Sequence, residues 1–480
     1  MIASTVRGRA GPGTAAAVWL AITAAAASPA AAQTRADVLD TVLPAVVAVA
    51  AEPIEARQVV PRGPGSPFEA FLRDFVDPPG EAGPEGGGIL GSGVVVDPAG
   101  WIVTTAHVVA GTATVTVVLD DRRRLPARLV GADDATDVAL LKVEAGRPLP
   151  AVRWGDSDRL RVGDWLVAVG NPFGLGPTVS AGIVSARARD IQQGPYDDFI
   201  QTDAAINRGS SGGPLFDARG DLIAIGSALL APAGGSVGIG FAIPAAVVRP
   251  IVEQLRAEGR VRRGWLGVQV QTLTPEIADA LGIASPRGAL VTAVTPGAPA
   301  DRAGLRPGDV VVGFAGRPVA RMRDLPRLVA ATAPGRRADL RLLRRGRETA
   351  VPVEVGELAA TAAAAVPDVP EPRGLSGSPA AGTPALAGLT VAPLDRALRD
   401  AFGVAPDVVG VMVTGVADDS PAARQGLAAG DVLVAVGETP VTTPDALRRA
   451  VDQQRRAGRP SAVVLVNRGG SVRYVALPLG

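Results

Sequence analysis

Several residue types that often carry chemistry are absent or scarce in this chain of 480 residues. There is no cysteine, which excludes disulfide bonds and a thiol nucleophile. There is a single histidine, His107, and one histidine without any cysteine cannot supply the four ligands of a Cys/His zinc site. We therefore expect no metal and no other cofactor.

Net charge and aromatic content are also low. The formal charge at pH 7 is +1, which gives no overall field to attract nucleic acid, so we expect no nucleic-acid partner. Aromatic residues make up 3% of the chain, but 47% of its residues are hydrophobic and can fill cores without them. Because 480 residues exceed what one core organises, we expect about two to four domains.

The N-terminus has the pattern of an export signal. Arg7 and Arg9 precede an apolar stretch at 15–27, and three alanines follow at 30–32. This order is typical of a secretory signal peptide, which we assign to residues 1–32. The apolar stretch is shorter than the ~20 residues of a membrane span. An uncleaved anchor, and with it peripheral membrane contact, stays open as the alternative.

Proline and glycine set the next segment apart. Residues 33–90 contain a Pro/Gly-rich stretch from 52 to 90, which predicts a loop. Within it, apolar residues recur at helical spacing over 68–76, and three of them are phenylalanines. Such a short helix would either dock on a neighbouring subunit or pack on its own domain, and the sequence leaves both open.

Residues 91–260 have the texture of an all-β domain. Short β-branched runs are separated by Gly, Pro, Asn and Asp, which predicts a barrel or a sandwich. A helix over Ala245–Glu258, with a kink at Pro250, is expected to close the domain. The runs lie at 93–96, 101–103, 113–119, 165–169 and 222–225.

The C-terminal half contains one sequence twice. PADRAGLRPGDV at 299–310 recurs as PAARQGLAAGDV at 421–432. Two copies of one small domain are the simplest explanation, and we assign them to 261–358 and 386–480. The Ala/Pro/Gly-rich stretch between them, 359–385, predicts a flexible linker.

Three motifs predict nucleophilic catalysis by a serine. His107 lies in Thr-Thr-Ala-His-Val-Val, Asp137 leads into an apolar run, and Ser211 lies in Gly-Ser-Ser-Gly-Gly-Pro. A serine hydroxyl is a weak nucleophile until a base accepts its proton, and His107 is the only imidazole available. The order His, Asp, Ser is that of chymotrypsin-type enzymes. The sequence therefore predicts a serine endopeptidase.

The supporting carboxylate has two competitors nearby. Asp137 enters an apolar strand and should be partly buried, whereas Asp133 and Asp134 lie in a turn-like stretch where we expect them to be solvated. Taken alone, a histidine such as His107 in an apolar strand is more often a core residue than a base. Its occurrence with the other two motifs, in this order, favours catalysis.

The segment before the nucleophile predicts an oxyanion hole. Charge that develops on a carbonyl oxygen needs convergent backbone N–H donors, and the amides of Gly209 and Ser211 are suited to this role, with Ser210 between them. Gly212 and Gly213 let the chain leave the nucleophile without obstruction. Taken alone, this glycine- and serine-rich run could also be a flexible loop.

These motifs resemble those of the HtrA/Deg (Do-type) serine proteases, and the resemblance covers nearly all of the chain after the export signal. The most specific matches are VGNPFGLG at 169–176, SAGIVS at 180–185, FIQTDAAINRG at 199–209 and GSVGIGFAIP at 235–244. The resemblance implies a mainly β fold. It consists of a chymotrypsin-like double β-barrel protease domain, followed by two PDZ domains that are small β-barrels with flanking helices.

A function is implied as well. Proteins that these motifs resemble are exported, periplasmic quality-control proteases that degrade misfolded or unfolded proteins without ATP and often act as chaperones. They assemble as trimers or multiples of trimers. The resemblance thus implies three kinds of partner: unfolded protein substrates, peptide C-termini and further copies of this chain.

The resemblance also places the binding sites. The substrate pocket is expected at Ile206, Leu229 and Ile239, which suit a small aliphatic residue before the cut. Ala205 lies where trypsin-like enzymes carry an acidic residue, so cleavage after Arg or Lys is disfavoured. The carboxylate-binding loop of the first PDZ domain is expected at Gly264, Trp265, Leu266, Gly267 and Val268, whereas residues 386–389 of the second are a weaker match.

The chain departs from this family beside the nucleophile. Ser210 stands where the family usually has asparagine. The polar stretch 187–198 is the candidate loop for sensing a bound peptide. We hypothesise that a peptide on the first PDZ domain favours the ordered state of this loop.

Two functions of different classes remain in competition. The chain is either an active endopeptidase or a holding chaperone and PDZ scaffold in which proteolysis is minor. The complete set of His107, Asp137 and Ser211 favours the endopeptidase, because a scaffold needs none of them.

Overall fold

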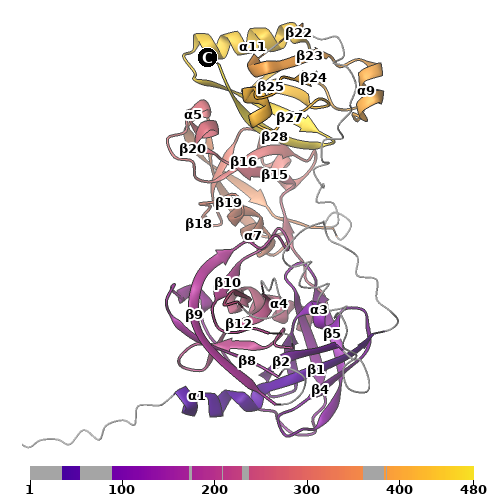
Figure 1. The fold of residues 1–480 in the computed structure, drawn as a ribbon, viewed down its shortest axis with the longest axis vertical. Helices are drawn as coiled ribbons and strands as arrows, with labels where there is room; N and C mark the ends of the chain where they lie inside the picture. The colour runs from indigo at the N-terminus through magenta and orange to yellow at the C-terminus, as the bar shows by residue number, and fades with distance from the viewer. Residues whose placement is uncertain are drawn as a thin grey trace, which may run out of the picture.

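The computed structural model describes residues 35–53, 89–171, 176–207, 209–229, 237–359, 383–384 and 386–479. The predicted export signal at 1–32 and the predicted helix at 68–76 lie outside these ranges. The described parts form three bodies that follow one another along the long axis in sequence order (Figure 1). Within them, no helix is both long enough and apolar enough to cross a bilayer.

Six antiparallel strands close the first barrel, in the order β1-β2-β3-β6-β5-β4. Valine is the commonest residue in its interior, as expected for β-branched side chains on a pleated surface. The strands are β1 (Val46–Pro53), β2 (Ile89–Asp97), β3 (Trp101–Thr104), β4 (Thr112–Val118), β5 (Arg124–Asp133) and β6 (Val138–Val143). Helix α1 (Arg35–Val42) and the 3-10 turn η1 (Leu43–Ala45) precede the barrel, and α3 (Ala106–Val109) follows β3.

The second barrel follows the order β11-β8-β9-β10-β13-β12 and closes where β11 pairs with β12. Its strands are β8 (Trp165–Gly170), β9 (Thr178–Arg189), β10 (Phe199–Thr202), β11 (Pro214–Phe216), β12 (Asp221–Leu229) and β13 (Gly240–Pro244). The short β7 (Arg153–Trp154) runs parallel to β12, and the 3-10 turn η2 (Ser157–Arg159) follows it. The predicted mainly β fold with a double barrel is confirmed.

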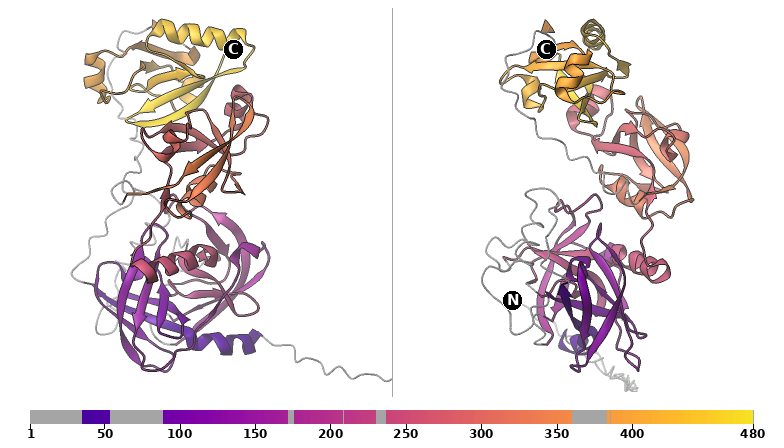
Figure 2. Two further views of the ribbon diagram at one scale, coloured as in Figure 1. Left: turned by 180° about the vertical axis from the view of Figure 1, so that it is seen from behind. Right: turned by 90° about the vertical axis from the view of Figure 1, so that its right-hand side faces the viewer.

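Helix α4 (Ala245–Glu258) joins the two barrels and has the bounds that the sequence predicted. It contacts β5 and β6 of the first barrel and β12 and β13 of the second, and it lies across both in Figure 2. Val248, Ile251 and Leu255 bury its apolar face. Pro250 lies inside the helix, which continues past it. The barrels therefore share part of one core.

The first PDZ body comprises eight strands and three helices. The strands are β14 (Gly264–Trp265), β15 (Val268–Thr272), β16 (Ala289–Val294), β17 (Val310–Phe314), β18 (Arg317–Pro318), β19 (Arg337–Arg344), β20 (Arg347–Glu354) and β21 (Gly356–Glu357). The helices are α5 (Pro275–Leu281), α6 (Pro299–Arg302) and α7 (Asp324–Ala330). In Figure 1, α7 lies at the end of this body that faces the barrels.

From β23 onward the described part of the second PDZ body repeats the order of elements from β15 to β20, and it has β22 at its start in place of β14. Its strands are β22 (Thr383–Pro384), β23 (Leu389–Pro393), β24 (Val411–Val416), β25 (Val432–Val436), β26 (Thr439–Pro440), β27 (Ser461–Arg468) and β28 (Ser471–Pro478). Its helical segments are η4 (Leu386–Gly388), α9 (Arg396–Phe402), α10 (Pro421–Arg424) and α11 (Pro444–Arg456). The sequence repeat thus folds as a structural repeat.

An ion pair between an arginine and a buried aspartate recurs in both copies. In the first, Arg344 donates to both oxygens of Asp309 at 2.8 and 2.7 Å. In the second, Arg468 donates to both oxygens of Asp431 at 2.5 and 2.7 Å. Each aspartate belongs to the repeated Gly-Asp-Val motif, whose valine begins β17 in the first copy and β25 in the second. The arginine lies on the strand paired with it, β19 in the first copy and β27 in the second. The repeat therefore encodes a charge pair inside each sheet.

The two PDZ bodies pack against each other through a shared apolar cluster. Ile277 and Leu290 of the first body and Leu465 of the second belong to it. Beside the cluster, the Gln271 side chain accepts from the Tyr474 amide at 2.6 Å and donates to its carbonyl at 3.2 Å. Burial raises the pKa of the Tyr474 hydroxyl to about 12. These contacts hold the two bodies as one unit.

Replacing Asp431 with alanine tests the buried pair. Asp431→Ala leaves the Arg468 guanidinium, whose side chain is 18% exposed, without its carboxylate, and should lower the free energy of unfolding by about 3 kcal/mol. Asp400→Ala is the control, because that aspartate is 73% exposed and its pair with Arg396 should contribute less than ~0.5 kcal/mol. Differential scanning calorimetry measures both variants, and equal shifts would contradict the prediction.

Candidate active site

The predicted catalytic residues come from both barrels. His107 lies on α3 and Asp137 directly precedes β6, so both belong to the first barrel. Ser211 lies in the loop before β11 of the second. All three are buried, with exposures of 6%, 3% and 2%. The structure therefore brings together residues that lie far apart in the sequence.

Asp137 holds the imidazole of His107. The His107 Nδ1 atom lies 2.8 Å from Oδ2 and 3.0 Å from Oδ1 of the carboxylate, and the His107 amide donates to Oδ1 at 3.0 Å. A carboxylate in this position keeps the proton of a neutral imidazole on Nδ1, which leaves the Nε2 lone pair to act as a base. Asp137 has a φ of 58°, an unusual left-handed conformation for a residue other than glycine.

Ser227 connects Asp137 with Ser211. Its hydroxyl donates to Asp137 Oδ2 at 2.6 Å, and its carbonyl accepts from the Ser211 hydroxyl at 3.3 Å. The Ser211 hydroxyl thus donates to the Ser227 carbonyl in this structure. It must turn toward the His107 imidazole before Ser211 can attack a substrate. Ser227 is fully buried on β12. Sequence reasoning missed it, because no motif in the sequence marks it.

Two expectations about neighbouring residues are wrong. Asp133 is 6% exposed rather than solvated, because Arg263 donates to both of its oxygens at 2.8 and 2.5 Å. Only Asp134 is exposed as predicted. His107 does not lie in a strand: β3 ends at Thr104, and a short helix begins at Ala106, whose amide donates to the Asp137 carbonyl at 3.2 Å.

Glycines after the nucleophile permit a close approach between the barrels. Gly212 has a φ of 84°, and a Cβ there would lie 2.1 Å from the Ser92 carbonyl and 2.4 Å from Thr104 Oγ1. A Cβ at Gly213 would lie 2.3 Å from the Val169 carbonyl. A side chain at Gly212 would push the nucleophile loop away from the first barrel, whereas one at Gly213 would push it away from β8 of its own barrel.

The predicted oxyanion donors differ in their present contacts. The Ser210 amide donates to the Asn207 carbonyl at 2.9 Å, so it is not available to a developing charge. The amides of Gly209 and Ser211 donate to no other described residue. Gly209 has a φ of 84°, a conformation that glycine adopts without strain. Gly209 and Ser211 therefore remain the candidate pair.

The predicted substrate pocket is partly described. Ile206 is buried and packs against β13, where a Cβ on Gly240 would lie 2.9 Å from its Cδ1 atom. Ile239 is half-buried and precedes that strand, and the backbone of Leu229 pairs with Gly240. The structure thus brings the three positions to one end of the β12–β13 pair. Their role in specificity stays a prediction.

The candidate sensor comprises the end of β9 and the loop 190–198. Asp197 organises this loop, since its carboxylate accepts from the amides of Ile191, Gln193 and Gly194 at 2.9, 3.0 and 2.8 Å. Burial raises the pKa of Asp197 above its ordinary value, and the hydrogen bonds from Gln193 and Ile191 act in the opposite direction.

The sensor loop also contacts the first PDZ body. Arg323, just before α7, lies 2.5 Å from an Asp190 oxygen, and Arg327 on α7 forms an ion pair with Asp198. The Arg263 guanidinium lies 4.9 Å from the centre of the Tyr196 ring. One loop therefore touches α7 on one side and leads into β10 and the nucleophile loop on the other.

The predicted carboxylate-binding loop runs from β14 to β15. Leu266 is buried, and Gly267 has a φ of 76°. A Cβ on Gly264 would lie 2.2 Å from the Val329 carbonyl, so β14 packs directly on the backbone of α7. The remaining residues, Trp265 and Val268, are half-buried.

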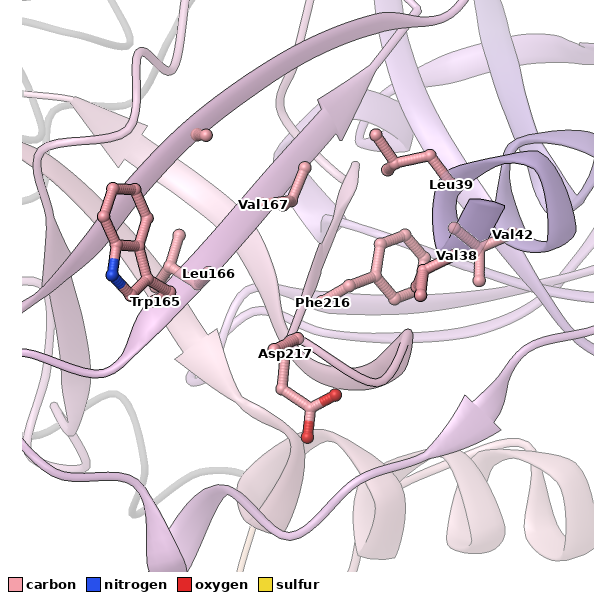
Figure 3. A pocket seen from close by; sticks show the side chains of 10 residues that line it. Val38, Leu39, Val42, Trp165, Leu166, Val167, Phe216 and Asp217 are labelled. Atoms are coloured by element: carbon pink, nitrogen blue, oxygen red, sulfur yellow. The ribbon is translucent and has the colours of Figure 1, made fainter. Parts of the chain in front are cut away.

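A separate apolar pocket lies away from the catalytic residues. Figure 3 shows Phe216 beside Val38 and Val42 of α1, with Trp165 farther along β8. Trp165 is 52% exposed, which is unusual for so large an apolar side chain.

Family models match three parts of the chain. Residues 91–225 match the trypsin-like peptidase domain, and residues 264–355 and 412–458 each match a PDZ domain. Relatives match over most of the chain. A probable periplasmic serine endoprotease, DegP-like, of Rhizobium meliloti (strain 1021) is 40% identical over 476 residues, covering 92% of this chain and 91% of the relative. Its namesake in Halomonas elongata is 42% identical over 415 residues, covering 86% and 83%.

Solved structures agree with these matches. The HtrA-type protease AlgW with a tripeptide is 38% identical and superposes with a TM-score of 0.56, covering 68% of this chain and 98% of that one. AlgW with a decapeptide is also 38% identical and has a TM-score of 0.54, covering 68% and 99%.

Removing the charge of Asp137 tests the hydrogen-bonded network. Asp137→Asn retains the shape but no longer selects the Nδ1–H tautomer, so the rate at which a fluorophosphonate probe labels Ser211 should fall on the order of 10⁴-fold. Asp134→Asn, next to the same turn but exposed, is the matched control and should label at the wild-type rate. Similar labelling rates for the two variants would remove Asp137 from the mechanism.

Proposed function

This chain belongs to the family of HtrA-type, DegP-like serine endoproteases, and on that premise we propose that it is exported to the periplasm and degrades misfolded or unfolded proteins there without ATP. The observation that carries the proposal is the buried chain of hydrogen bonds from His107 through Asp137 and Ser227 to Ser211. A chaperone or scaffold has no use for such a network.

We assign the catalytic steps to these residues. Ser211 attacks the scissile carbonyl while His107 takes its proton and later gives it to the leaving amine. Asp137 stabilises the imidazolium that forms between these steps. The amides of Gly209 and Ser211 bind the oxyanion, and their fixed backbone needs no reorganisation as the charge develops.

Cleavage after small aliphatic residues follows from the pocket assigned to Ile206, Leu229 and Ile239. These side chains present no charge, and Ala205 offers no carboxylate to a basic side chain. An arginine or lysine of the substrate would lose water there without gaining a partner. Valine, alanine or isoleucine before the cut is therefore favoured.

Peptide C-termini bind to the first PDZ body rather than to the second in this proposal. Among the described strands, only β16 pairs with β15, so the other edge of β15 is open to an added peptide strand. In the second body, β23 pairs with β24 on one side and with β22 on the other. Thr383 opposite Val391 thus occupies the corresponding edge.

Regulation is proposed to pass through α7. The carboxylate-binding loop begins at β14, which packs on α7, and α7 carries Arg327, the partner of Asp198 in the sensor loop. A cavity of about 310 Å³ beside this contact, lined in part by Tyr196 and Leu328, leaves α7 room to move. A bound peptide would bias this loop toward the order that the oxyanion hole requires.

We also propose that the chain forms trimers or multiples of trimers and holds substrates as a chaperone. Val162, Trp165 and Val179 lie on or beside the β8–β9 pair with exposures of 65%, 52% and 40%. Such apolar residues would be covered by a second copy of the chain. Peripheral contact with a membrane stays a secondary proposal.

Unfolded casein tests the proteolytic function. The mature wild-type chain should degrade it without ATP, and Ser211→Ala should not, because the variant lacks the nucleophile. Mass spectrometry of the products should find Val, Ala or Ile before most of the cuts.

Ser210→Ala is the matched control, since it removes the neighbouring hydroxyl and should retain most of the activity. Equal degradation by wild type and Ser211→Ala would refute the assignment. If Ser211→Ala still prevents aggregation of casein, the chaperone part of the proposal is supported.

The contact between α7 and the loop can be tested with peptides. Decapeptides that differ in their last residue are first compared as activators of the wild-type chain. The double variant Arg323→Ala/Arg327→Ala should bind the best activator with unchanged affinity but lose most of its stimulation. Arg321→Ala, whose side chain is 61% exposed and pairs only with Asp324 among the described residues, is the control. Full stimulation in the double variant would rule out this route.

A further inference from the structure

Ser92 in β2 has no part in the mechanism assigned above, yet it lies against the nucleophile loop. It is fully buried. Its amide donates to the Ser211 carbonyl at 2.7 Å, and its hydroxyl donates to the Gly209 carbonyl at 2.6 Å. The same hydroxyl accepts from the Asn171 amide, just after β8, at 2.7 Å. One small side chain thus joins both barrels to the loop.

The Gly209 carbonyl belongs to the peptide unit that links Gly209 to Ser210. At the other end of this planar unit, the Ser210 amide donates to the Asn207 carbonyl at 2.9 Å. Both polar ends are therefore held, and the unit cannot rotate without breaking both hydrogen bonds. The next carbonyl, that of Ser210, is also held, since it accepts from the Gly213 amide at 2.9 Å.

The two candidate oxyanion donors lie on the peptide units that flank the held one. Their directions depend on it, because only the φ and ψ angles of Gly209 and Ser210 separate the units. We infer that Ser92 is a positioning residue for catalysis. Its hydroxyl fixes the Gly209–Ser210 peptide unit so that the amides of Gly209 and Ser211 converge on one point. This inference rests on the proposed role of Ser211 as the nucleophile.

Loss of the hydroxyl would leave two buried polar atoms without a partner, the Gly209 oxygen and the Asn171 nitrogen. A buried carbonyl in that state is unfavourable, and the glycine that carries it can turn easily, so the unit would rotate to find another donor. Rotation moves the Gly209 amide away from the oxyanion. The effect should appear in binding of the transition state and not in binding of the substrate.

The experiment compares Ser92→Ala with Ser157→Ala in the full chain. Ser157 is 1% exposed and its hydroxyl accepts from the Ala246 amide at 3.0 Å, so its loss also removes a hydrogen bond of a buried side chain, but away from the loop. Three quantities are measured: kcat and KM for a short chromogenic peptide with valine before the cut, the affinity for a peptide boronic acid of the same sequence, and Tm. The boronate forms a tetrahedral adduct with an oxygen at the oxyanion position.

Ser92→Ala should lower kcat about 10- to 100-fold, somewhat less than the loss of an oxyanion donor, while KM changes less than about threefold. The boronate affinity should fall in parallel with kcat. Ser157→Ala should lower Tm by a similar amount and leave kcat within about twofold of wild type.

Wild-type kcat and boronate affinity in Ser92→Ala, or losses no larger than those in Ser157→Ala, would overturn the inference. A wild-type chain that neither cleaves the peptide nor binds the boronate would instead contradict the proposed function. If Ser92→Ala does not fold, Ser92→Thr and Ser92→Cys are compared. A hydroxyl is a better hydrogen-bond donor than a thiol, so Ser92→Thr should bind the boronate more tightly than Ser92→Cys. Equal affinities of these two variants would count against a positioning role of the Ser92 hydroxyl.

Discussion

The buried carboxylate of Asp137 is the group on which the proposed catalytic centre depends. It accepts from the His107 amide, from the His107 ring and from the Ser227 hydroxyl while remaining 3% exposed. Burying a charged carboxylate without such donors would be very unfavourable, so α3, the start of β6 and β12 must meet for the charge to be tolerated. The same contacts hold the imidazole in the tautomer that a general base needs.

Close contact between the barrels is the second constraint. The nucleophile loop can approach β2 because Gly212 has no Cβ, and the amide and hydroxyl of Ser92 then hold the loop from the other barrel. Helix α4 packs on both barrels and buries apolar surface between them. The loop 190–198, the turn at Asp133 and the chain that follows α4 link the barrels to the first PDZ body.

The two PDZ bodies share a scaffold and differ at their edges. Both contain the aspartate–arginine pair inside the sheet, and the two bodies pack on one apolar cluster. They differ at the strand that a peptide would extend: β15 has one described neighbour, whereas β23 has two. In our proposal this difference assigns peptide sensing to the copy that also touches the barrels through Arg323 and Arg327.

Local pattern alone determined much of this molecule. The strand runs, the bounds of α4 and the repeat could all be predicted from the sequence, which also contains only one imidazole to propose as the base. Long-range contacts could not. Asp133 appeared solvated because its partner, Arg263, is distant in the sequence, and Ser227 and Ser92 carry no motif. Periodicity and composition indicate which face of a segment is exposed to solvent and how the segment packs on its immediate neighbours. Which hydroxyl or guanidinium reaches a buried carboxylate or carbonyl is decided only when the barrels close and pack together.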